Sequence, residues 1–382
     1  MSQLDQMEFE THVCLVSREA AANFLPAVSE GFKPKYVVLV VTKEMDQQAE
    51  SLKEAFKRAI PGVQVFNLTL SSSWNIEKTT DEISKFLLDN DLPSPVLNAT
   101  GGHKLMMLGA YRAFYLHDRP VFYFRVEQGD IQLITPNDKQ EKISTIKCEP
   151  NLEHYLLAYG YRIDSSAKKS ERAFDYIHKE LCETLIKNHS TYSDGMKAIN
   201  YLATEAEKNG SLNVPYSDKN PAVIALLEEF EKYKILKISS DKVNFASESD
   251  RQFANGGWLE SYVYDAVCQI IQGKKLAKNI TILSLDSNVK NEIDVAFVYA
   301  NRLYLIECKT SSEQSKFSDF IYKIDSLGKI GGTKVRKILI SYQEIQDRGT
   351  LERAKANKVD IIDGKDLVRL IENLKKCLKK DI

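Results

Sequence analysis

Several residue types and patterns that would mark a particular protein class are scarce in this sequence. Its six cysteines are scattered over 382 residues, with no CxxC pair and no cluster of histidines beside them. This spacing argues against structural zinc and against a disulfide-stapled scaffold, and it is typical of a reducing compartment. The formal net charge is only −1, which excludes a globally basic nucleic-acid-binding protein and confines any basic surface to one part of the molecule.

Long apolar stretches are missing as well. No stretch approaches the roughly 20 apolar residues of a membrane-spanning helix, so we expect no membrane association. The first residues lack the basic and apolar regions of a secretory signal, and a cytoplasmic location is therefore expected. The hydrophobic content of 43% and the charged content of 27% are ordinary for a globular protein. The length predicts two or three domains.

The most informative stretch is residues 291–310, which predicts a β-hairpin because two apolar, β-rich runs are joined by a tight turn. Four charged residues interrupt these runs: Glu292 and Asp294 on the first strand, and Glu307 and Lys309 on the second. Antiparallel pairing brings the start of one strand beside the end of the other, so Asp294 and Glu307 should lie together. Glu307 and Lys309 are two residues apart and should point to the same face.

This group of charges favours a metal site. Two adjacent carboxylates repel each other, and burying both is costly unless a cation lies between them. Carboxylate oxygens suit Mg²⁺ or Mn²⁺, and Lys309 beside such an ion could orient the attacking water and stabilise charge on a phosphate. The alternative is a solvated edge-strand pair of Glu307 and Lys309, since Glu-x-Lys is a common sequence. Asp294 supplies the second carboxylate and favours the metal site.

The N-terminal third alternates apolar, strand-like runs with helical patterns, which predicts a doubly wound, mostly parallel sheet. Ligands of such sheets bind beyond the carboxyl ends of the strands, so the loops that follow the strands matter most. The predicted strands are 12–16, 36–41, 63–68, 96–99 and 121–126, and the predicted helices are 18–29, 44–59, 74–88 and 104–116.

One loop after a predicted strand stands out because it passes through two glycines and enters a helix. The glycines let the backbone approach a phosphate, the helix N-terminus offers free N–H groups, and Lys104 adds a positive charge. The loop matches neither GxxxxGK[ST] nor GxGxxG, and a plain strand-to-helix turn is the alternative. Its sequence is Asn98-Ala99-Thr100-Gly101-Gly102-His103-Lys104-Leu105-Met106.

The middle of the chain begins with an expected exit strand and linker over 145–170. Helical patterns at 173–187, 193–208 and 220–233, followed by a hairpin at 234–246, predict a winged-helix-like arrangement. Such a unit could bind DNA, but its presumed recognition helix is rich in glutamate and poor in arginine. We therefore favour a spacer or dimerisation module over a domain that reads DNA sequence.

The C-terminal third predicts the element order α-β-β-β-α-β-α-β-α around the charged hairpin. Basic residues crowd the segment after this hairpin, where they could hold a phosphodiester backbone or form a solvated face. They are Lys323, Lys329, Lys334, Arg336 and Lys337.

The charged hairpin resembles the active site of the PD-(D/E)xK, or restriction-endonuclease-like, superfamily. Asp294 matches the first-strand aspartate of that superfamily, and Glu307 and Lys309 match its (D/E)xK. The resemblance implies metal-dependent phosphodiester hydrolysis. In that reaction Asp294 and Glu307 would ligate Mn²⁺ or Mg²⁺, helped by the Cys308 carbonyl, and Lys309 would position and activate water.

Two further glutamates are candidates for the same site. Families of this superfamily often carry a glutamate on the first helix, and Glu260 matches it in the run that opens at Gly256. The alternative for Glu260 is a first-turn glutamate that complements the helix dipole. Glu260 and Glu292 would act as additional ligands or would support the ligands from behind.

The glycine-rich loop resembles the N-x-T-G-G-x-K-x-M signature of CARF domains, the CRISPR-associated Rossmann-like sensors, and His103 stands where a small hydroxyl residue is common. Ser17-Arg18 and the downstream Asn23 resemble the first ligand loop of that family. Further pocket residues are expected at Thr42 and Ser71, where the second and third strands end. The residues that match the signature are Asn98, Thr100, Gly101, Gly102, Lys104 and Met106.

Together the two resemblances imply a type III CRISPR nuclease that is activated allosterically by cyclic tetra-adenylate. CARF domains bind cyclic oligoadenylates as two-fold dimers, so a homodimer is implied. Related enzymes nick DNA and also cut single-stranded RNA, and either substrate is expected here. The implied organisation is a Rossmann-like CARF domain at 1–150, a helical, winged-helix-like spacer at 151–250 and a restriction-endonuclease-like α/β domain at 251–382.

Two other functions are compatible with the residues. The first is a non-catalytic DNA-binding regulator that responds to cyclic oligoadenylate and carries a vestigial nuclease domain. An intact set of Asp294, Glu307 and Lys309 argues against it. The second is a CARF domain that also degrades its own activator, which the sequence neither favours nor excludes.

Overall fold

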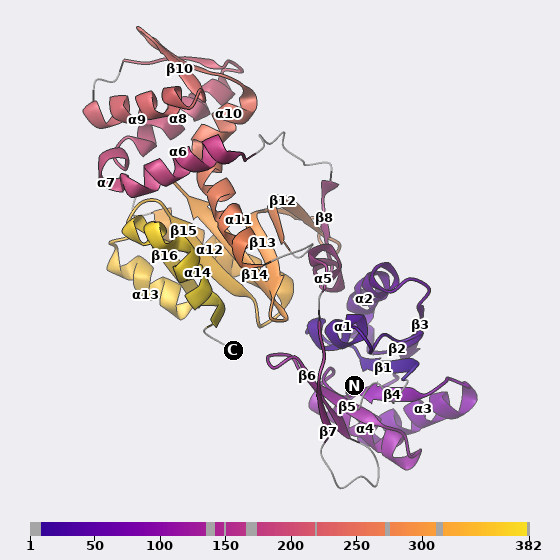
Figure 1. The fold of residues 1–382 in the computed structure, drawn as a ribbon. Helices are drawn as coiled ribbons and strands as arrows, with labels where there is room; N and C mark the ends of the chain where they lie inside the picture. The colour runs from indigo at the N-terminus through magenta and orange to yellow at the C-terminus, as the bar shows by residue number, and fades with distance from the viewer. Residues whose placement is uncertain are drawn as a thin grey trace.

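A computed structural model of the chain describes residues 9–134, 142–148, 150–165, 174–217, 220–271, 276–310 and 316–379. Residues 166–170 of the expected linker and the first residue of the helix expected from Ala173 lie outside these ranges. Figure 1 shows an N-terminal domain, a helical middle unit and a C-terminal α/β domain, with the C-terminal domain between the other two.

The N-terminal domain is built on a seven-stranded sheet in the order β3-β2-β1-β4-β5-β6-β7. Strands β1 to β5 pair in parallel, and β6 and β7 continue the sheet in antiparallel fashion. All five predicted strands are present, which confirms the doubly wound, mostly parallel sheet. The strands are β1 (Thr11–Leu15), β2 (Tyr36–Val41), β3 (Gln64–Thr69), β4 (Pro95–Asn98), β5 (Val121–Arg125), β6 (Asp130–Ile134) and β7 (Lys142–Thr145), and the helices are α1 (Ala21–Val28), η2 (Lys43–Met45), α2 (Asp46–Ala59), α3 (Ile76–Asp89) and α4 (Lys104–Leu116).

The side chains of this sheet alternate between two cores, because successive strand residues point to opposite faces. Cys14 of β1 packs in the core that contains Phe24 of α1, whereas its neighbours Val13 and Leu15 pack in the core that contains Phe114 of α4. The sheet is therefore covered by helices on both faces, and its ligand edge lies where the parallel strands end.

The linker after the N-terminal domain contributes to the C-terminal sheet. Helix α5 (Leu152–Ala158) packs on α2, and Gly160, with φ +83°, redirects the chain into β8 (Tyr161–Ile163). Strand β8 then pairs in antiparallel fashion with β12 (Leu276–Ser284) of the C-terminal domain. The chain thus enters the C-terminal sheet long before the rest of that sheet is reached.

The middle unit contains the three predicted helices and the predicted hairpin, and a further short strand extends the hairpin to the order β10-β11-β9. Asn220 caps one helix by accepting a hydrogen bond from the Ala222 N–H at 3.0 Å. The elements are α6 (Tyr176–Lys187), α7 (His189–Tyr192), α8 (Met196–Lys208), β9 (Asn213–Pro215), α9 (Pro221–Lys232), β10 (Leu236–Ser239), β11 (Lys242–Phe245) and α10 (Glu248–Gln252).

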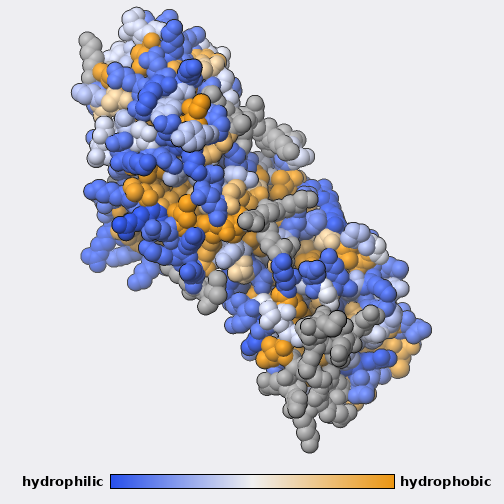
Figure 2. Space-filling view, viewed as in Figure 1, coloured by the Kyte–Doolittle hydropathy of each residue, from blue (hydrophilic) through white to orange (hydrophobic). Residues whose placement is uncertain are grey.

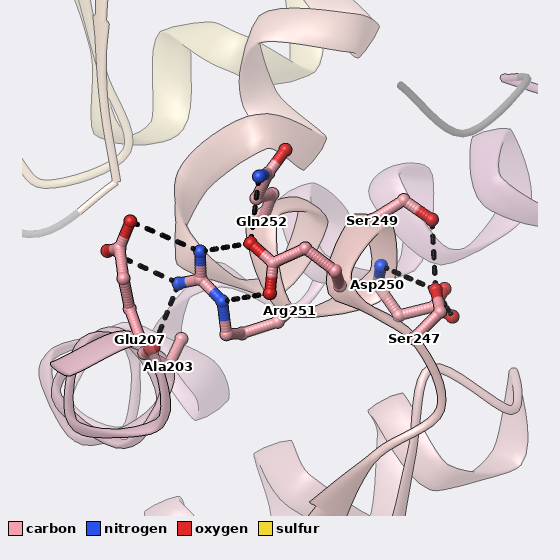
Figure 3. A network of polar contacts seen from close by, with 8 residues as sticks. Ala203, Glu207, Ser247, Ser249, Asp250, Arg251 and Gln252 are labelled. Carbon is pink, nitrogen blue, oxygen red and sulfur yellow. Dashed lines mark hydrogen bonds and ion pairs between the residues drawn. The ribbon is translucent and has the colours of Figure 1, made fainter. Parts of the chain in front are cut away.

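A buried arginine fastens the end of the middle unit (Figure 3). The side chain of Arg251 is 2% exposed. It donates to both carboxylate oxygens of Glu248, at 2.6 and 2.8 Å, and to the Ala203 carbonyl at 2.9 Å. Glu207 lies 3.4 Å from the same guanidinium. Because Ala203 and Glu207 belong to α8, Arg251 ties α10 to α8 just before the C-terminal domain begins.

The C-terminal domain has a mixed sheet in the order β16-β15-β14-β13-β12-β8. The predicted element order is confirmed, with short 3-10 and π segments added between elements. The remaining elements are η4 (Phe253–Gly257), α11 (Trp258–Ile270), β13 (Lys290–Tyr299), β14 (Arg302–Lys309), α12 (Phe317–Leu327), η6 (Gly328–Gly331), β15 (Arg336–Ser341), α13 (Arg348–Ala356), β16 (Val359–Asp363), η7 (Gly364–Arg369) and α14 (Leu370–Lys379).

Hydrophobic side chains are unevenly distributed over the surface. On the face shown in Figure 2, hydrophobic residues gather mainly over the C-terminal domain, and hydrophilic residues cover much of the two ends. Within the described ranges, none of the helices combines the length and the apolar character that crossing a bilayer requires.

Candidate active site and glycine-rich loop

The hairpin of β13 and β14 brings the predicted carboxylates together. Its turn residues Ala300 and Asn301 have φ values of +45° and +64°, the left-handed pair that matches the twist of a two-residue hairpin. This turn sets a register in which Val295 pairs with Ile306. Asp294 and Glu307 come next to that pair, one on each strand, as the alternation of the sequence predicts.

The surroundings of Asp294 disfavour the ionised form of its carboxylate. Its side chain is 14% exposed, and Oδ2 accepts a hydrogen bond from the Cys308 N–H at 2.7 Å. Burial, followed by repulsion from the Glu307 carboxylate, raises the pKa of Asp294 from 3.8 to about 6. The Lys309 ammonium, the Cys308 N–H and Lys323 oppose this rise without cancelling it.

Glu307 is compensated by two ammonium groups. Its side chain is only 2% exposed, and Lys309 Nζ lies 2.7 Å from Oε1. Lys323 of α12 donates to both oxygens, at 2.7 and 2.9 Å. Lys309 also lies 3.9 Å from Asp294 Oδ2, so one lysine reaches both carboxylates. Burial acts to lower the pKa of Lys309, but attraction by Asp294 and Glu307 outweighs it and leaves the pKa raised.

The donor set suits a hard divalent cation. The carboxylates of Asp294 and Glu307 both face the Lys309 ammonium, which partly neutralises their repulsion. Among the described residues, no group of three or more His, Cys, Asp and Glu side chains could hold a metal ion. A site with two carboxylates and otherwise water, carbonyl or phosphate oxygens fits Mg²⁺ or Mn²⁺, which commonly keep several waters.

The other predicted active-site residues come from α11, β14 and β13. Glu260 lies in the first turn of α11, close enough to Cys308 for its charge to contribute to the raised pKa of that thiol, of which burial is the main cause. Because the Cys308 side chain is buried and its thiol is kept protonated, only its carbonyl suits a hard metal ion. Glu292 is exposed and lies two residues before Asp294 on β13, opposite Thr281 of β12.

The middle unit contacts the strand end that carries Lys309. Asn200 of α8 donates to the Thr310 hydroxyl at 2.9 Å, one residue beyond Lys309. The Tyr342 N–H donates to the Lys309 carbonyl at 2.7 Å, and the Tyr342 carbonyl lies 2.7 Å from Nε2 of His189 in α7. The unit that the sequence suggests is a spacer therefore braces the active strand.

The basic cluster of the sequence does not form one free phosphate-binding surface. Lys323 binds Glu307, Lys334 lies 2.7 Å from Glu127 of the N-terminal domain, and Lys337 lies 2.5 Å from Asp325. Lys334 and Lys337 are thus paired with carboxylates of other elements, and a common phosphate-holding role for the cluster stays a prediction. The side chain of Lys329 lies outside the described part of the chain.

In the N-terminal domain, the glycine-rich loop is held by two buried asparagines. Asn23 and Asn98 are both fully buried. Asn23 donates to the Leu15 carbonyl at 2.8 Å, and Asn98 donates to the Ala22 carbonyl at 2.9 Å and accepts from the Thr100 N–H at 3.0 Å. Asn98 also donates to Asn23 Oδ1 at 3.2 Å, so the two side chains hold each other as well as the backbone of the loop.

Gly101 and Thr100 complete the loop for steric and polar reasons. A Cβ on Gly101 would lie 2.2 Å from the Leu15 carbonyl oxygen, so only glycine fits against β1. The Thr100 hydroxyl accepts a hydrogen bond from the Phe124 N–H at 2.8 Å, which ties the loop to β5. Gly102 has φ +73° and directs the chain into α4, whose first residue, Lys104, is exposed.

The remaining predicted ligand residues lie along the carboxyl edge of the sheet. Ser17-Arg18 follows β1, Thr42 follows β2 and Ser71 lies just beyond β3. The Ser71 N–H donates to Glu82 at 3.0 Å and its hydroxyl also binds that carboxylate. Met106 is buried beneath the start of α4.

Two residues that sequence reasoning did not assign to a site now stand out. Lys323 was grouped with other basic residues, and only the packing of α12 on the sheet shows that it binds Glu307. Trp74, the start of a predicted helix, stacks on His103 of the glycine-rich loop with ring centroids 4.4 Å apart. Neither contact has a local sequence signal, because Lys323 lies 16 residues from Glu307 and Trp74 lies 29 residues from His103.

Three of the polar contacts between the N-terminal and C-terminal domains lie around a cavity of about 460 Å³ whose lining includes Thr100 of the glycine-rich loop. We call them the interdomain contacts. They are Asn301 Nδ2 to the Val126 carbonyl at 3.0 Å, the Thr333 N–H to Glu19 Oε1 at 2.9 Å, and Lys334 Nζ to Glu127 Oε1 at 2.7 Å. Asn301 is part of the turn of the active hairpin, so that hairpin is anchored directly on the N-terminal domain.

Comparisons with known proteins agree with both halves of the chain. A family model described as the Card1 CARF domain matches residues 11–155, and one described as the Card1-like endonuclease domain matches residues 247–380. None of the curated proteins matches the sequence. The domain order expected from the sequence, a CARF domain followed by an endonuclease domain, is confirmed.

Solved structures extend the similarity over nearly the whole chain. Protein VC1899 from Vibrio cholerae is 23% identical, with a TM-score of 0.86 over 97% of this chain and 98% of its own. Can2 from Sulfobacillus thermosulfidooxidans, solved with cyclic tetra-adenylate, is 25% identical, with a TM-score of 0.79 over 97% and 99%. A type III CRISPR defence DNA nuclease activated by cyclic oligoadenylate is 18% identical, with a TM-score of 0.54 over 88% of this chain and 46% of its own.

Proposed function

Since this chain belongs to the CARF-domain endonucleases, with a Card1 CARF domain before a Card1-like endonuclease domain, we propose that it is a divalent-metal-dependent nuclease activated by a cyclic oligoadenylate. The observation that carries the catalytic half is the buried group of Asp294, Glu307 and Lys309, in which one ammonium reaches both carboxylates. The CARF half is supported by the shaped glycine loop and by the similarity to Can2, which was solved with cyclic tetra-adenylate.

In the proposed reaction, Asp294 and Glu307 would hold Mn²⁺ or Mg²⁺ together with the Cys308 carbonyl. The ion, when bound, neutralises charge on the scissile phosphate of DNA or single-stranded RNA and supplies a water of lowered pKa. Lys309 lies beside both carboxylates and orients the attacking water while stabilising negative charge on the phosphate. Glu260 and Glu292 support the ligand set from α11 and from the exposed end of β13.

Ring binding is proposed at the carboxyl edge of the N-terminal sheet. The Thr100–Gly102 backbone, the N-terminus of α4 and Lys104 offer N–H groups and positive charge to a ring phosphate. Ser17, Arg18, Thr42 and Ser71 line the same edge. A ring of repeated adenylates suits two identical edges that face each other, so the active form is a homodimer.

The interdomain contacts offer a route for activation. The turn of the active hairpin is bonded to the Val126 carbonyl, and Glu19 follows the Ser17-Arg18 loop directly. A ring that repositions this loop against a second subunit would therefore pull on the C-terminal domain through Glu19 and through the hairpin turn. Because the middle unit holds the other end of the strand next to Lys309, a displaced turn would strain this strand at the proposed catalytic lysine.

The decisive experiment is cleavage of supercoiled plasmid and of labelled single-stranded RNA with Mn²⁺, with and without cyclic tetra-adenylate. Ring-dependent cutting that Glu307→Gln abolishes, and that Lys104→Ala shifts to higher ring concentration, is expected. Ring binding without cutting of either substrate, across several divalent metals, would exclude the nuclease and leave a ring-responsive regulator.

A further inference from the structure

A large aromatic side chain lies exposed beside the glycine-rich loop. Trp74 is 73% exposed, whereas Trp258, the other tryptophan of the chain, is fully buried. Trp74 comes shortly after β3, at the same carboxyl edge as the loop, and one face of its indole lies on the His103 imidazole, at 4.4 Å between centroids and 19° between planes. An indole this exposed contributes little to the core, so its position calls for another explanation.

The ring beneath it is held rigidly. His103 Nδ1 accepts a hydrogen bond from the Met106 N–H at 3.4 Å and thereby caps α4. His103 Nε2 lies 2.9 Å from the hydroxyl of Ser73, which is itself buried. With both nitrogens engaged, the imidazole cannot turn without losing one contact. Trp74 therefore rests on a fixed platform that is continuous with the glycine-rich loop.

His103 is also where this chain departs from the CARF signature, which commonly has a small hydroxyl residue there. A hydroxyl group could cap the helix but could not support an indole. The exchange therefore gains an aromatic surface while keeping the cap, and the surface directly follows the backbone expected to hold a ring phosphate. A cyclic oligoadenylate places a base within a few bonds of every phosphate.

We propose that the solvent-facing side of Trp74 stacks on an adenine base of the bound cyclic oligoadenylate, with His103 as the second layer of the stack. This inference rests on the proposed ring-binding function and assigns the base contact that the phosphate loop alone does not provide. Stacking between an aromatic side chain and a base needs an open π-face and excludes water from both rings. Trp74 offers such a face, supported from behind.

The expected size of the effect follows from base stacking. Removing an aromatic platform weakens binding of a stacked base by on the order of tenfold. Trp74→Ala should therefore weaken ring binding by on the order of tenfold, and Trp74→Phe should retain part of the affinity. Phe66→Ala is the matched control, because Phe66 is an exposed aromatic on the edge strand β3 of the same domain and lies away from the loop.

The test is a titration of the full-length protein with cyclic tetra-adenylate, followed by calorimetry and by tryptophan fluorescence. Only Trp74 is open to solvent, so stacking should change the wild-type emission saturably, with the same midpoint as the calorimetric binding. Trp74→Phe should lose this change while still binding the ring, because the buried Trp258 then supplies the remaining signal. Phe66→Ala should bind like wild type.

Several outcomes separate the inference from the proposed function. Ring binding that Trp74→Ala leaves as tight as in wild type would overturn the stacking. A tryptophan emission that changes with protein concentration but not with added ring would also overturn the stacking, because a second copy of the chain would then cover Trp74. A wild-type protein that shows no calorimetric ring binding would refute the proposed ring-binding function, and the stacking with it.

Discussion

Replacing Asp294 by asparagine is expected to stabilise the metal-free protein. Burial and the neighbouring Glu307 carboxylate raise the pKa of Asp294 from 3.8 to about 6, so its ionised form is disfavoured in the folded state. Asparagine keeps an oxygen that can accept the Cys308 N–H and has no charge to repel Glu307. The variant would therefore gain stability while losing a metal ligand.

The magnitude and its pH dependence follow from the linkage between protonation and folding. A rise from 3.8 to about 6 corresponds to about 3 kcal/mol of destabilisation once Asp294 is ionised in both states. In the folded state the proton is retained up to about pH 6, whereas the unfolded chain releases it near pH 4. The stability of the wild type relative to Asp294→Asn therefore falls as the pH rises from about 4 to 6. Above about pH 6 the stability difference between the two proteins has its full size.

Urea unfolding of both proteins with a chelator present, at several pH values between 4.5 and 8, measures this difference. Asp294→Asn should be more stable by about 1 to 3 kcal/mol at pH 8 and by less at pH 4.5. Asp241→Asn, an exchange at an exposed turn position, is the control and should show no such trend. Addition of millimolar Mn²⁺ should reverse the order, because only the wild type retains both ligands.

A destabilised Asp294→Asn variant at pH 8 would refute this reasoning. It would show that the carboxylate is favourably placed without metal, so that attraction by Lys309 exceeds the costs of burial and repulsion. A gain in stability that is equally large at pH 4.5 would also contradict it, because the effect would then come from packing and not from charge.

Three other perturbations probe the remaining contacts. Lys323→Gln removes an ammonium group that is 42% exposed and binds Glu307. Because a competing cation is lost, the affinity for Mn²⁺, measured by calorimetry, should rise by roughly 3- to 10-fold. An unchanged affinity, or an equal rise in the exposed-site control Lys355→Gln, would argue against this competition. Glu127→Lys places like charges at the contact with Lys334 and should raise the ring concentration needed for half-maximal cleavage. Adding Lys334→Glu restores the opposite charges and should bring this concentration back down. If the double variant does not recover, the contact does not couple the domains. Arg251→Met removes a guanidinium that is 2% exposed and should lower the free energy of unfolding by about 2 kcal/mol or more. A loss below about 0.5 kcal/mol in urea titrations would show that the contacts of Arg251 with α8 and Glu248 add little to stability.

The local patterns of the sequence predicted the N-terminal sheet and the active hairpin well. The strands β1, β2, β4 and β5 were predictable because apolar runs between helical patterns have few other ways to be buried, whereas β3 is a mostly exposed edge strand that the alternation of strands and helices predicted. The juxtaposition of Asp294 and Glu307 was predictable too, because a two-residue turn and the period of two in a strand determine the register. Each of these inferences uses residues close in sequence.

Other features could be seen only in the folded chain. Strand β8, Tyr161–Ile163, is three residues long, too short to show a period, and its partner β12 lies more than a hundred residues further on. The sequence also suggested that Lys334 and Lys337 serve a phosphate backbone, but each is paired with a carboxylate from another element. A charged side chain carries no local record of its partner.

The sequence by itself thus determined the domain order, the sheet of the N-terminal domain and the residues that we propose for both sites, because periodicity, turn chemistry and short motifs act over a few residues. The tertiary structure alone decided that Lys323 binds Glu307, that Trp74 rests on His103, and that the active hairpin is anchored to the Val126 carbonyl. These contacts join separate elements, and their geometry depends on how helices and strands pack on one another.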